Sequence, residues 1–171
     1  DGTVNTMPIA MTPANFARLG NQILGQHYGW GGMLGLRDCS AMTRDLMTPF
    51  GIWLPRNSRS QGRVGYPTSL AGMSSAEKEA TLQRSGVPFA TLVVMNGHVV
   101  LYIGTYEGRP AIMHDLWGIR VDEPADEDQR LIIGRAVITT LTPGAEVSNL
   151  HNGRTIGESF HTMTVLGNAH K

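Results

Sequence analysis

The spacing of the hydrophobic residues changes halfway along this chain, and the change restricts the folds that are open to it. Before residue 86, two segments, Phe16–Leu24 and Cys39–Phe50, have apolar residues at intervals of three and four, a pattern that indicates helices. From Phe89 onward, runs of β-branched and apolar residues are separated by turn residues, which indicates strands. The chain has no internal repeat. Helices followed by antiparallel strands predict an α+β fold.

Three helices are predicted in the first half of the chain. The first has Thr12 as its N-cap and a proline as its first residue. The second begins at Cys39, with Asp38 as its N-cap, and ends near Gly51. The third follows Ser74, which has capping-box spacing to a glutamate three residues later. Each predicted helix therefore has a start signal that does not depend on its apolar spacing.

Four strands are predicted in the second half. The Asn-Gly pair at 96–97 is the strongest hairpin signal that a short sequence can carry, and it separates the first two strands. The predicted strands are Phe89–Met95, Val99–Ile103, Arg109–Asp115 and one within Leu131–Thr140. Three stretches are expected to be irregular: residues 62–74 as a surface loop, the acidic stretch 122–128 as a solvated turn, and the tail 142–171 as loop or short strand over the surface.

Composition excludes several classes of function. The chain has 171 residues, 41% of them hydrophobic, which suits one domain with its own core. Fourteen basic residues balance fourteen acidic ones, so no net field attracts nucleic acid or an anionic membrane surface. No apolar run is long enough for membrane insertion. No histidines have metal-ligand spacing on a helix, so we expect no metal and no other cofactor.

The single cysteine, Cys39, follows a glycine-rich approach segment, Tyr28–Gly32, and directly precedes Ser40. A helix N-terminus carries unsatisfied N–H groups and a partial positive charge, which favour the thiolate of a cysteine in the first turn. The same N–H groups could hold the oxyanion of an acyl-transfer intermediate. The alternative is a lone cysteine that packs as a small hydrophobic residue. The pattern points to a nucleophile.

Two histidines in the strand region, His98 and His114, could supply the base that a nucleophilic thiol needs. If they share one face of the sheet, His98 would take the proton of Cys39 or hold it in a thiolate–imidazolium pair, and His114 would orient His98. A single histidine in a strand is more often a satisfied polar group. Two on one face beside a capped cysteine favour catalysis.

The turn between the second and third strands decides whether the two imidazoles meet. A two-residue loop at 107–108 would place them on opposite faces. A three-residue loop at 106–108, with its glycine left-handed, would pair Thr105 with Arg109 and put His114 opposite Val100. The histidines would then be diagonal neighbours on adjacent strands, with roughly 7–8 Å between their backbones. We predict the three-residue loop.

Several blocks of this sequence resemble the NlpC/P60 cysteine peptidases, papain-like enzymes that cut bacterial cell-wall peptides. The resemblance covers residues 15–140. It is carried, in order, by Tyr28-Gly29-Trp30-Gly31-Gly32, Asp38-Cys39-Ser40, Leu54-Pro55-Arg56-Asn57-Ser58, Gly97-His98-Val99 and Ile112-Met113-His114. It implies a papain-like fold with N-terminal helices packed on a central antiparallel sheet. The chain looks most like catalytic domains that follow SH3-type wall-binding domains, so we expect one catalytic domain, with a core at 12–141, an extension at 142–171 and an upstream domain absent.

The resemblance also implies the roles of individual residues. Cys39 would be the nucleophile, His98 the base and His114 the third polar member. Tyr28 would line the cleft and help the oxyanion site, and Asp38 and Ser40 would hold the free amino terminus of the substrate. Trp30 is a further candidate for substrate binding, as a platform for a sugar together with Trp53, although single tryptophans beside glycines more commonly fill gaps in a core.

The implied substrate is a muropeptide, cut between γ-linked D-glutamate and the following diamino acid by a periplasmic or secreted monomer. Two other readings stay open. One is another acyl-transfer enzyme with the same thiol and imidazole chemistry, such as an amidase or acyltransferase. The other is a catalytically silent wall-binding domain, which the presence of Cys39, His98 and His114 disfavours.

Overall fold

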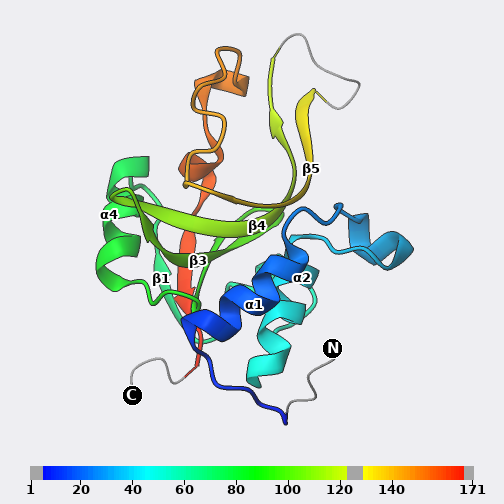
Figure 1. The fold of residues 1–171 in the computed structure, drawn as a ribbon. Helices are drawn as coiled ribbons and strands as arrows, with labels where there is room; N and C mark the ends of the chain where they lie inside the picture. The colour runs from blue at the N-terminus through cyan, green and yellow to red at the C-terminus, as the bar shows by residue number, and fades with distance from the viewer. Residues whose placement is uncertain (1–5, 123–128, 168–171) are drawn as a thin grey trace.

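One antiparallel sheet of six strands forms the centre of the molecule. The computed structural model describes residues 6–122 and 129–167. The strands lie in the order β1-β6-β2-β3-β4-β5, and every neighbouring pair is antiparallel. Their bounds are β1 Tyr66–Ser69, β2 Thr91–Met95, β3 His98–Tyr106, β4 Arg109–Arg120, β5 Arg130–Thr139 and β6 Thr162–Val165 (Figure 1). The predicted α+β class is confirmed.

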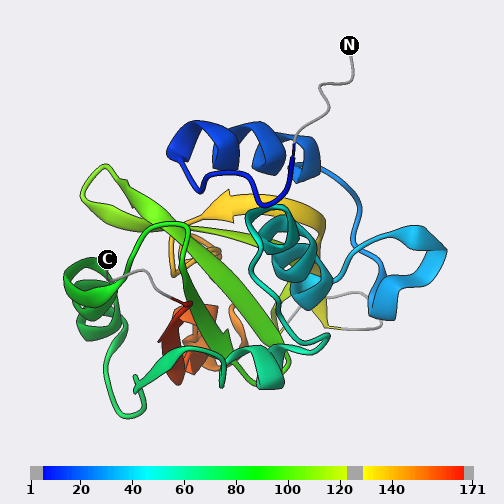
Figure 2. The same ribbon diagram turned by 90° about the horizontal axis from the view of Figure 1, so that it is seen from below.

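Helices cover both faces of this sheet (Figure 2). The α-helices are α1 Pro13–Ile23, α2 Cys39–Met47, α3 Ser58–Gln61 and α4 Ser75–Ser85. Two predicted N-caps are confirmed: Thr12 Oγ1 accepts from Asn15 N at 3.2 Å, and Ser74 forms a capping box with Glu77. Helices α1 and α2 lie on one face, and α4 lies on the other, together with the short 3-10 helix η4 (Ile156–Ser159).

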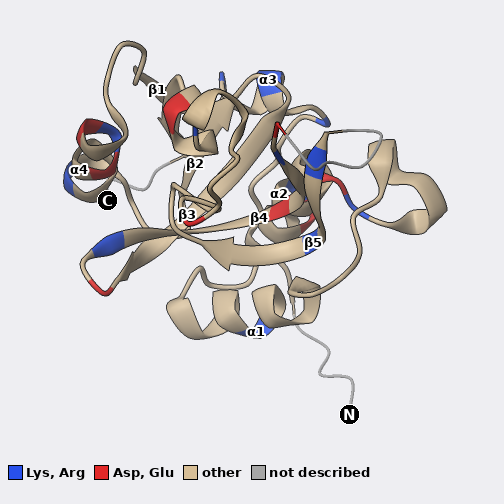
Figure 3. Cartoon of the chain, turned by 90° about the horizontal axis from the view of Figure 1, so that it is seen from above, with Lys and Arg blue, Asp and Glu red and all other residues tan. Residues whose placement is uncertain are grey.

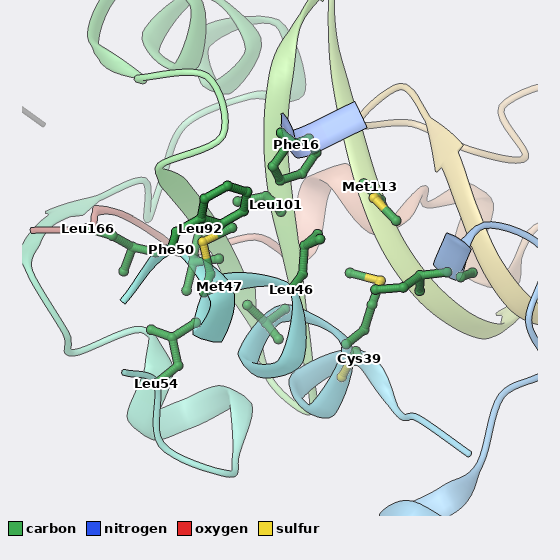
Figure 4. Close-up of a cluster of buried hydrophobic side chains, with 14 of the residues drawn as sticks. Phe16, Cys39, Leu46, Met47, Phe50, Leu54, Leu92, Leu101, Met113 and Leu166 are labelled. Atoms are coloured by element: carbon green, nitrogen blue, oxygen red, sulfur yellow. The ribbon is translucent and has the colours of Figure 1, made fainter. Parts of the chain in front are cut away.

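The apolar side chains form two layers, one on each face of the sheet. In the larger layer, Phe16 and Leu46 pack against Leu101 and Met113, and the side chain of Cys39 lies at one end of the cluster (Figure 4). In the second layer, side chains of α4 and of the C-terminal segment pack against Val100 and Ile112. Burial of each large apolar side chain stabilises the fold by about 1.5–3 kcal/mol. The sheet is thus fixed from both sides, which holds the residues at its strand ends in place.

The C-terminal segment, from residue 142 onward, contributes a strand to the sheet. The sequence predicts instead that this segment lies over the surface. Strand β6 lies between β1 and β2, and its Met163 and Val165 are buried. Its partner β1 falls within residues 62–74, where only a loop was expected. Both strands have only four residues, too few for their alternation to stand out, and their pairing joins segments almost 100 residues apart.

A buried lysine attaches the rest of the C-terminal segment to α4. Lys78 is only 2% exposed, and its Nζ donates to the carbonyl oxygens of Gly157 at 3.2 Å and Glu158 at 2.7 Å. A buried ammonium needs such acceptors to offset its loss of hydration. The segment that contains η4 is therefore held against the same face of the sheet as α4.

The turn that joins β3 and β4 differs from the prediction. It is a two-residue loop, because Tyr106 pairs with Arg109, and its central residues Glu107 and Gly108 have φ of 49° and 77°. A turn with two left-handed residues suits a two-residue hairpin, and glutamate is an unusual occupant of it. The three-residue loop was therefore wrong.

The expected alignment of the histidines nevertheless holds, because of a feature the sequence did not reveal. The register shifts by one residue between Tyr102 and Gly104, a β-bulge at Ile103. Beyond the bulge Leu101 pairs with Met113, so the next residue along β4, His114, reaches the level of Val100. His98 and His114 consequently lie on one face, as predicted.

Charged side chains are scattered over the surface, and in Figure 3 basic and acidic residues are interspersed. Most of the acidic stretch predicted as a solvated turn, residues 123–128, lies outside the described residues. Among the helices that the structure describes, none combines the length and the apolar character needed to cross a bilayer.

Candidate active site

Cys39 is the first residue of α2, and its sulfur lies against the start of β3. Asp38 caps the helix, since its Oδ1 accepts from Ala41 N at 2.8 Å. The thiol Sγ donates to the carbonyl oxygen of Gly97 at 3.9 Å, and the nearby backbone N–H of Val99 favours its thiolate form. Gly97 and Val99 are the two neighbours of His98 in the sequence. Packing of α2 on β3 therefore brings the sulfur to the backbone on either side of that histidine.

The two histidines contact each other directly. His98 Nε2 and His114 Nδ1 are 2.9 Å apart, and both rings are buried. His114 Nε2 is 3.0 Å from Thr139 Oγ1, on β5, and this hydroxyl lies 2.8 Å from the carbonyl oxygen of Thr140. A line of hydrogen bonds thus runs across β3, β4 and β5. Among the described residues, Cys39 Sγ hydrogen-bonds to backbone groups and not to either imidazole.

Burial keeps both Cys39 and His98 uncharged at neutral pH. Cys39 is 4% exposed, and burial raises the pKa of its thiol to about 11, although the N–H of Val99 acts in the opposite direction. Burial lowers the pKa of His98 to about 4. The thiolate expected from the helix N-terminus is therefore not the resting state. Cys39 therefore rests as a neutral thiol and His98 as a neutral imidazole.

Asp38 and Ser40, predicted to hold the amino terminus of a substrate, are both bound to Arg56. Its Nη1 donates to Asp38 Oδ1 at 2.9 Å and to Ser40 Oγ at 2.9 Å, and its Nη2 donates to Asp38 Oδ2 at 2.7 Å. Burial opposes ionisation of Asp38, but this guanidinium and the N–H of Ala41 outweigh burial and lower the pKa of the carboxyl. The carboxylate is charged, and its charge is already balanced by Arg56.

Three aromatic rings lie together beside the histidines. Tyr28 and Trp30 have ring centroids 5.1 Å apart, and Trp117 lies 5.8 Å from Tyr28 and 5.7 Å from Trp30. Trp30 is 54% exposed and Trp53 is 75% exposed, so the interpretation of these two tryptophans as core residues was wrong. Trp117 was missed, although a tryptophan three residues after a candidate catalytic histidine was a usable signal.

A cavity of about 640 Å³ opens beside these rings. Its wall includes Tyr28, Trp30 and His98, residues 116–120 of β4, and residues of the segment 151–159. Cys39 lies behind this wall and does not form part of it. Residues of the segment 151–159 therefore close one side of the cleft that His98 lines.

Asp115 is a buried carboxyl next to His114 that sequence reasoning did not single out. It is 1% exposed, and neither of its oxygens has a hydrogen-bond partner among the described residues. Burial and, to a smaller extent, the charge of Asp38 raise its pKa to about 7, while Arg37 acts in the opposite direction. An acidic residue inside an otherwise apolar strand was the available signal. Over residues 6–122 and 129–167, no three side chains are grouped as metal ligands would be.

Comparison with known proteins finds one matching family and several similar structures. The model of the NlpC/P60 family matches residues 25–127. An NlpC/P60 endopeptidase from Photobacterium damselae subsp. piscicida has a similar structure, with a TM-score of 0.81 and 27% identity over 94% of this chain and 40% of that one. An NlpC/P60 family protein from Bacillus cereus has a TM-score of 0.55 and 19% identity over 92% of this chain and 41% of that one.

The peptidoglycan hydrolase RipB from Mycobacterium tuberculosis has a TM-score of 0.50 and 16% identity over 91% of this chain. The chain thus spans 40%, 41% and 65% of the lengths of these three structures. A comparison with curated protein sequences finds no match. The family match covers more than half of the residues, including Cys39 and both histidines. By this match, the chain belongs to the NlpC/P60 family.

Proposed function

We propose that this protein is a cysteine endopeptidase that hydrolyses the bond between γ-linked D-glutamate and the following diamino acid in peptidoglycan stem peptides. Cys39 is the nucleophile, His98 the general base and His114 the third polar member. The observation that carries this proposal is the 2.9 Å contact between His98 and His114, beside the capped helix start that bears Cys39. The similar structures from Photobacterium and Mycobacterium, named as an endopeptidase and a peptidoglycan hydrolase, support the reaction class.

Each half of the reaction moves one proton onto His98 and then off it again. As Cys39 Sγ bonds to the carbonyl carbon of the substrate, its proton passes to His98 Nδ1. The carbonyl oxygen becomes an oxyanion, which accepts from the N–H groups at the start of α2 and from the Tyr28 hydroxyl. The C–N bond then breaks, and His98 returns the proton to the departing amine. Water repeats the sequence on the thioester and releases the carboxylate and the thiol.

Tyr28 suits the oxyanion role because its hydroxyl stays protonated. Burial raises the pKa of Tyr28 far above its ordinary value, and the nearby Cys39 and Asp38 raise it further. A neutral phenol can donate a hydrogen bond, whereas a phenolate cannot. Tyr28 would therefore stabilise negative charge that appears on the carbonyl oxygen.

The substrate lies along the cleft between the aromatic residues and the C-terminal segment. The exposed face of Trp30 offers an apolar platform for part of the muropeptide. Asp38 and Ser40 would receive the amino terminus of the stem, sharing the Asp38 carboxylate with Arg56. Because Arg56 already balances this charge, the interaction with an ammonium is weaker than that of an unpaired carboxylate.

The substrate also determines where such an enzyme works. Peptidoglycan lies outside the cytoplasmic membrane, so we propose a periplasmic or secreted enzyme that acts on the wall or on its fragments. The described residues leave the number of subunits open, and a monomer suffices for the proposed mechanism, since Cys39, His98 and His114 all come from one chain.

Digestion of purified muropeptides, followed by mass measurement of the products, tests the proposal. The expected products are a fragment that ends in D-glutamate and a fragment that begins with the diamino acid. Cys39→Ala should yield neither, while circular dichroism shows a folded protein. Cleavage of simple amides or thioesters alone would make the protein another kind of acyl-transfer enzyme. Binding without any cleavage would make it a wall-binding domain.

A further inference from the structure

We propose that Thr139 is a positioning residue that fixes the proton positions on both histidines and so leaves the Nδ1 lone pair of His98 free for Cys39. This proposal rests on the proposed roles of Cys39 and His98. Thr139 is half-buried at the end of β5, two strands away from His98, and it touches neither the sulfur nor the cleft. Its effect would be transmitted through His114.

The donors and acceptors in this line of hydrogen bonds follow from its last acceptor, the carbonyl oxygen of Thr140. A carbonyl oxygen can only accept, so the Thr139 hydroxyl must donate its one proton to the Thr140 oxygen, 2.8 Å away. Thr139 Oγ1 then has only lone pairs to offer to His114 Nε2, at 3.0 Å. His114 Nε2 must therefore carry a proton and donate it. In a neutral imidazole, the other nitrogen, Nδ1, is then an acceptor.

The same reasoning continues from His114 to His98. Because His114 Nδ1 accepts, His98 Nε2 must be the donor across the 2.9 Å contact. The neutral ring of His98 therefore has its proton on Nε2 and a lone pair on Nδ1. A general base needs such a lone pair at the nitrogen that receives the proton of the thiol. Thr139 thus determines the state of an atom two rings away.

A histidine in the third position makes this outside control necessary. A carboxylate can only accept, so it fixes the tautomer of its partner without help. A neutral imidazole can point its proton in either direction. If the line ran in reverse, His114 would donate from Nδ1, His98 would accept at Nε2, and His98 Nδ1 would carry a proton toward the thiol. That form of His98 cannot act as a base.

Solvent cannot replace Thr139 in this arrangement. His114 is 0% exposed, so its Nε2–H has no water to donate to if the hydroxyl is removed. Without an acceptor there, the reversed form becomes favourable because it moves the proton from the unpaired nitrogen to Nδ1. Loss of one hydroxyl would therefore redistribute the tautomers without any change in net charge.

The test compares Thr139→Val, which removes the hydroxyl at similar volume, with Thr139→Ser, which keeps it. With muropeptide as substrate, Thr139→Val should lower kcat about ten-fold with an unchanged KM, and Thr139→Ser should stay within about two-fold of wild type. Thr162→Val is the matched control, because Thr162 Oγ1 also contacts an imidazole, Nδ1 of His161 at 2.8 Å. Thr162 is the first residue of β6 and lies outside the line of hydrogen bonds. This variant should retain full activity. If Thr139→Val does not fold, Thr139→Ala takes its place.

A second readout does not depend on activity. Nitrogen-15 NMR of the imidazole rings at neutral pH should show both His98 and His114 protonated on Nε2 in wild type, and protonated on Nδ1 in a large fraction of Thr139→Val. Unchanged tautomers together with wild-type kcat in Thr139→Val would overturn the proposal. Wild-type tautomers with a lower kcat would overturn it as well, by assigning the loss to packing. If the wild-type protein cleaved no muropeptide, the proposed function would fail, and the tautomers would still decide the role of Thr139.

Discussion

His114 and Asp115 are neighbours on β4 that point to opposite faces of the sheet. Both are buried polar side chains, and they differ in whether they have hydrogen-bond partners in the part of the chain that the structure describes. Both ring nitrogens of His114 have partners, His98 and Thr139. Neither oxygen of Asp115 has one among the described residues. Both side chains are almost completely buried, at 0% and 1% exposed. Burial is the same on the two faces, and only the hydrogen bonds differ.

The difference shows what hydrogen bonds add to burial. Burial alone makes a group neutral: burial lowers the pKa of His114 well below its ordinary value, with His98 adding to the effect, and burial raises the pKa of Asp115 to about 7. Partners decide in addition which atom holds the proton. The hydrogen bonds of His114 therefore determine which nitrogen carries its proton. Asp115 is protonated at low pH and loses its proton as the pH rises.

The largest effect on activity should come from replacing His98, the proposed base. We expect His98→Ala to lower kcat/KM for muropeptide by roughly 10³-fold or more, nearly as much as Cys39→Ala, because the two act as one unit. Steady-state kinetics with product masses provides the measurement. Residual activity within ten-fold of wild type would show that His98 is a structural residue.

His114→Ala should have a smaller effect, a loss of roughly 10²-fold in kcat, because orientation of His98 contributes only part of the catalytic acceleration. The loss should appear in kcat and not in KM, because His114 contacts His98 and does not line the cleft. Equal and negligible losses for His98→Ala and His114→Ala would show that the two histidines are structural, and that the hydrogen bonds of His114 have no role in activity.

On the other face, Asp115→Asn should change stability with a characteristic pH dependence. Between the ordinary pKa of 3.8 and the folded value of about 7, the folded state keeps a proton that the unfolded state has released. Stability therefore falls as the pH rises through this window, by roughly 2–3 kcal/mol between pH 5 and pH 8. The variant cannot ionise and should lack this fall.

Urea unfolding at both pH values measures the effect of Asp115→Asn. The variant should be less stable than wild type at pH 5, or similar to it, and should gain relative to wild type at pH 8. A difference between variant and wild type that is the same at both pH values would show that Asp115 is ionised in the folded protein, or has a partner there.

Replacement of Lys78 tests how the C-terminal segment is attached to the face of the sheet that carries the histidines. Lys78→Met should reduce the free energy of unfolding by about 2 kcal/mol, because two buried carbonyl oxygens lose their donor. KM for muropeptide should rise, since residues 151–159 line the cleft. Arg84→Met, which removes a largely exposed cation from the same helix, is the control and should change stability by no more than about 0.5 kcal/mol. Equal effects of the two variants would contradict the anchoring role.

The local sequence predicted much of this site because its signals are local. Helix caps at Thr12, Asp38 and Ser74 require only nearby residues, and all three are confirmed. The shared face of His98 and His114 was predicted through the wrong turn, because a β-bulge at Ile103 compensated for the two-residue loop. A bulge depends on how two strands pack, and it leaves little trace in either strand alone.

Features that depend on distant segments could not be read from the sequence. The position of β6 in the sheet and the contact of Thr139 with His114 join residues 25 or more positions apart. The raised pKa of the Cys39 thiol was also not predicted, because the helix N-terminus is a local signal whereas burial results from the whole fold. The sequence located Cys39 at the start of a helix, and the packing around its thiol determines its charge.

Titration of the Cys39 thiol tests most directly whether the nucleophile and its base are neutral at rest. Cys39 is the only cysteine in the chain, so the difference in ultraviolet absorbance between wild type and Cys39→Ala, which share their four tyrosines, follows its thiolate against pH. We expect no thiolate at neutral pH and ionisation in the alkaline range, near the pKa of about 11. A thiolate already present at pH 6, and lost in His98→Ala, would contradict the neutral pair and establish a preformed ion pair instead.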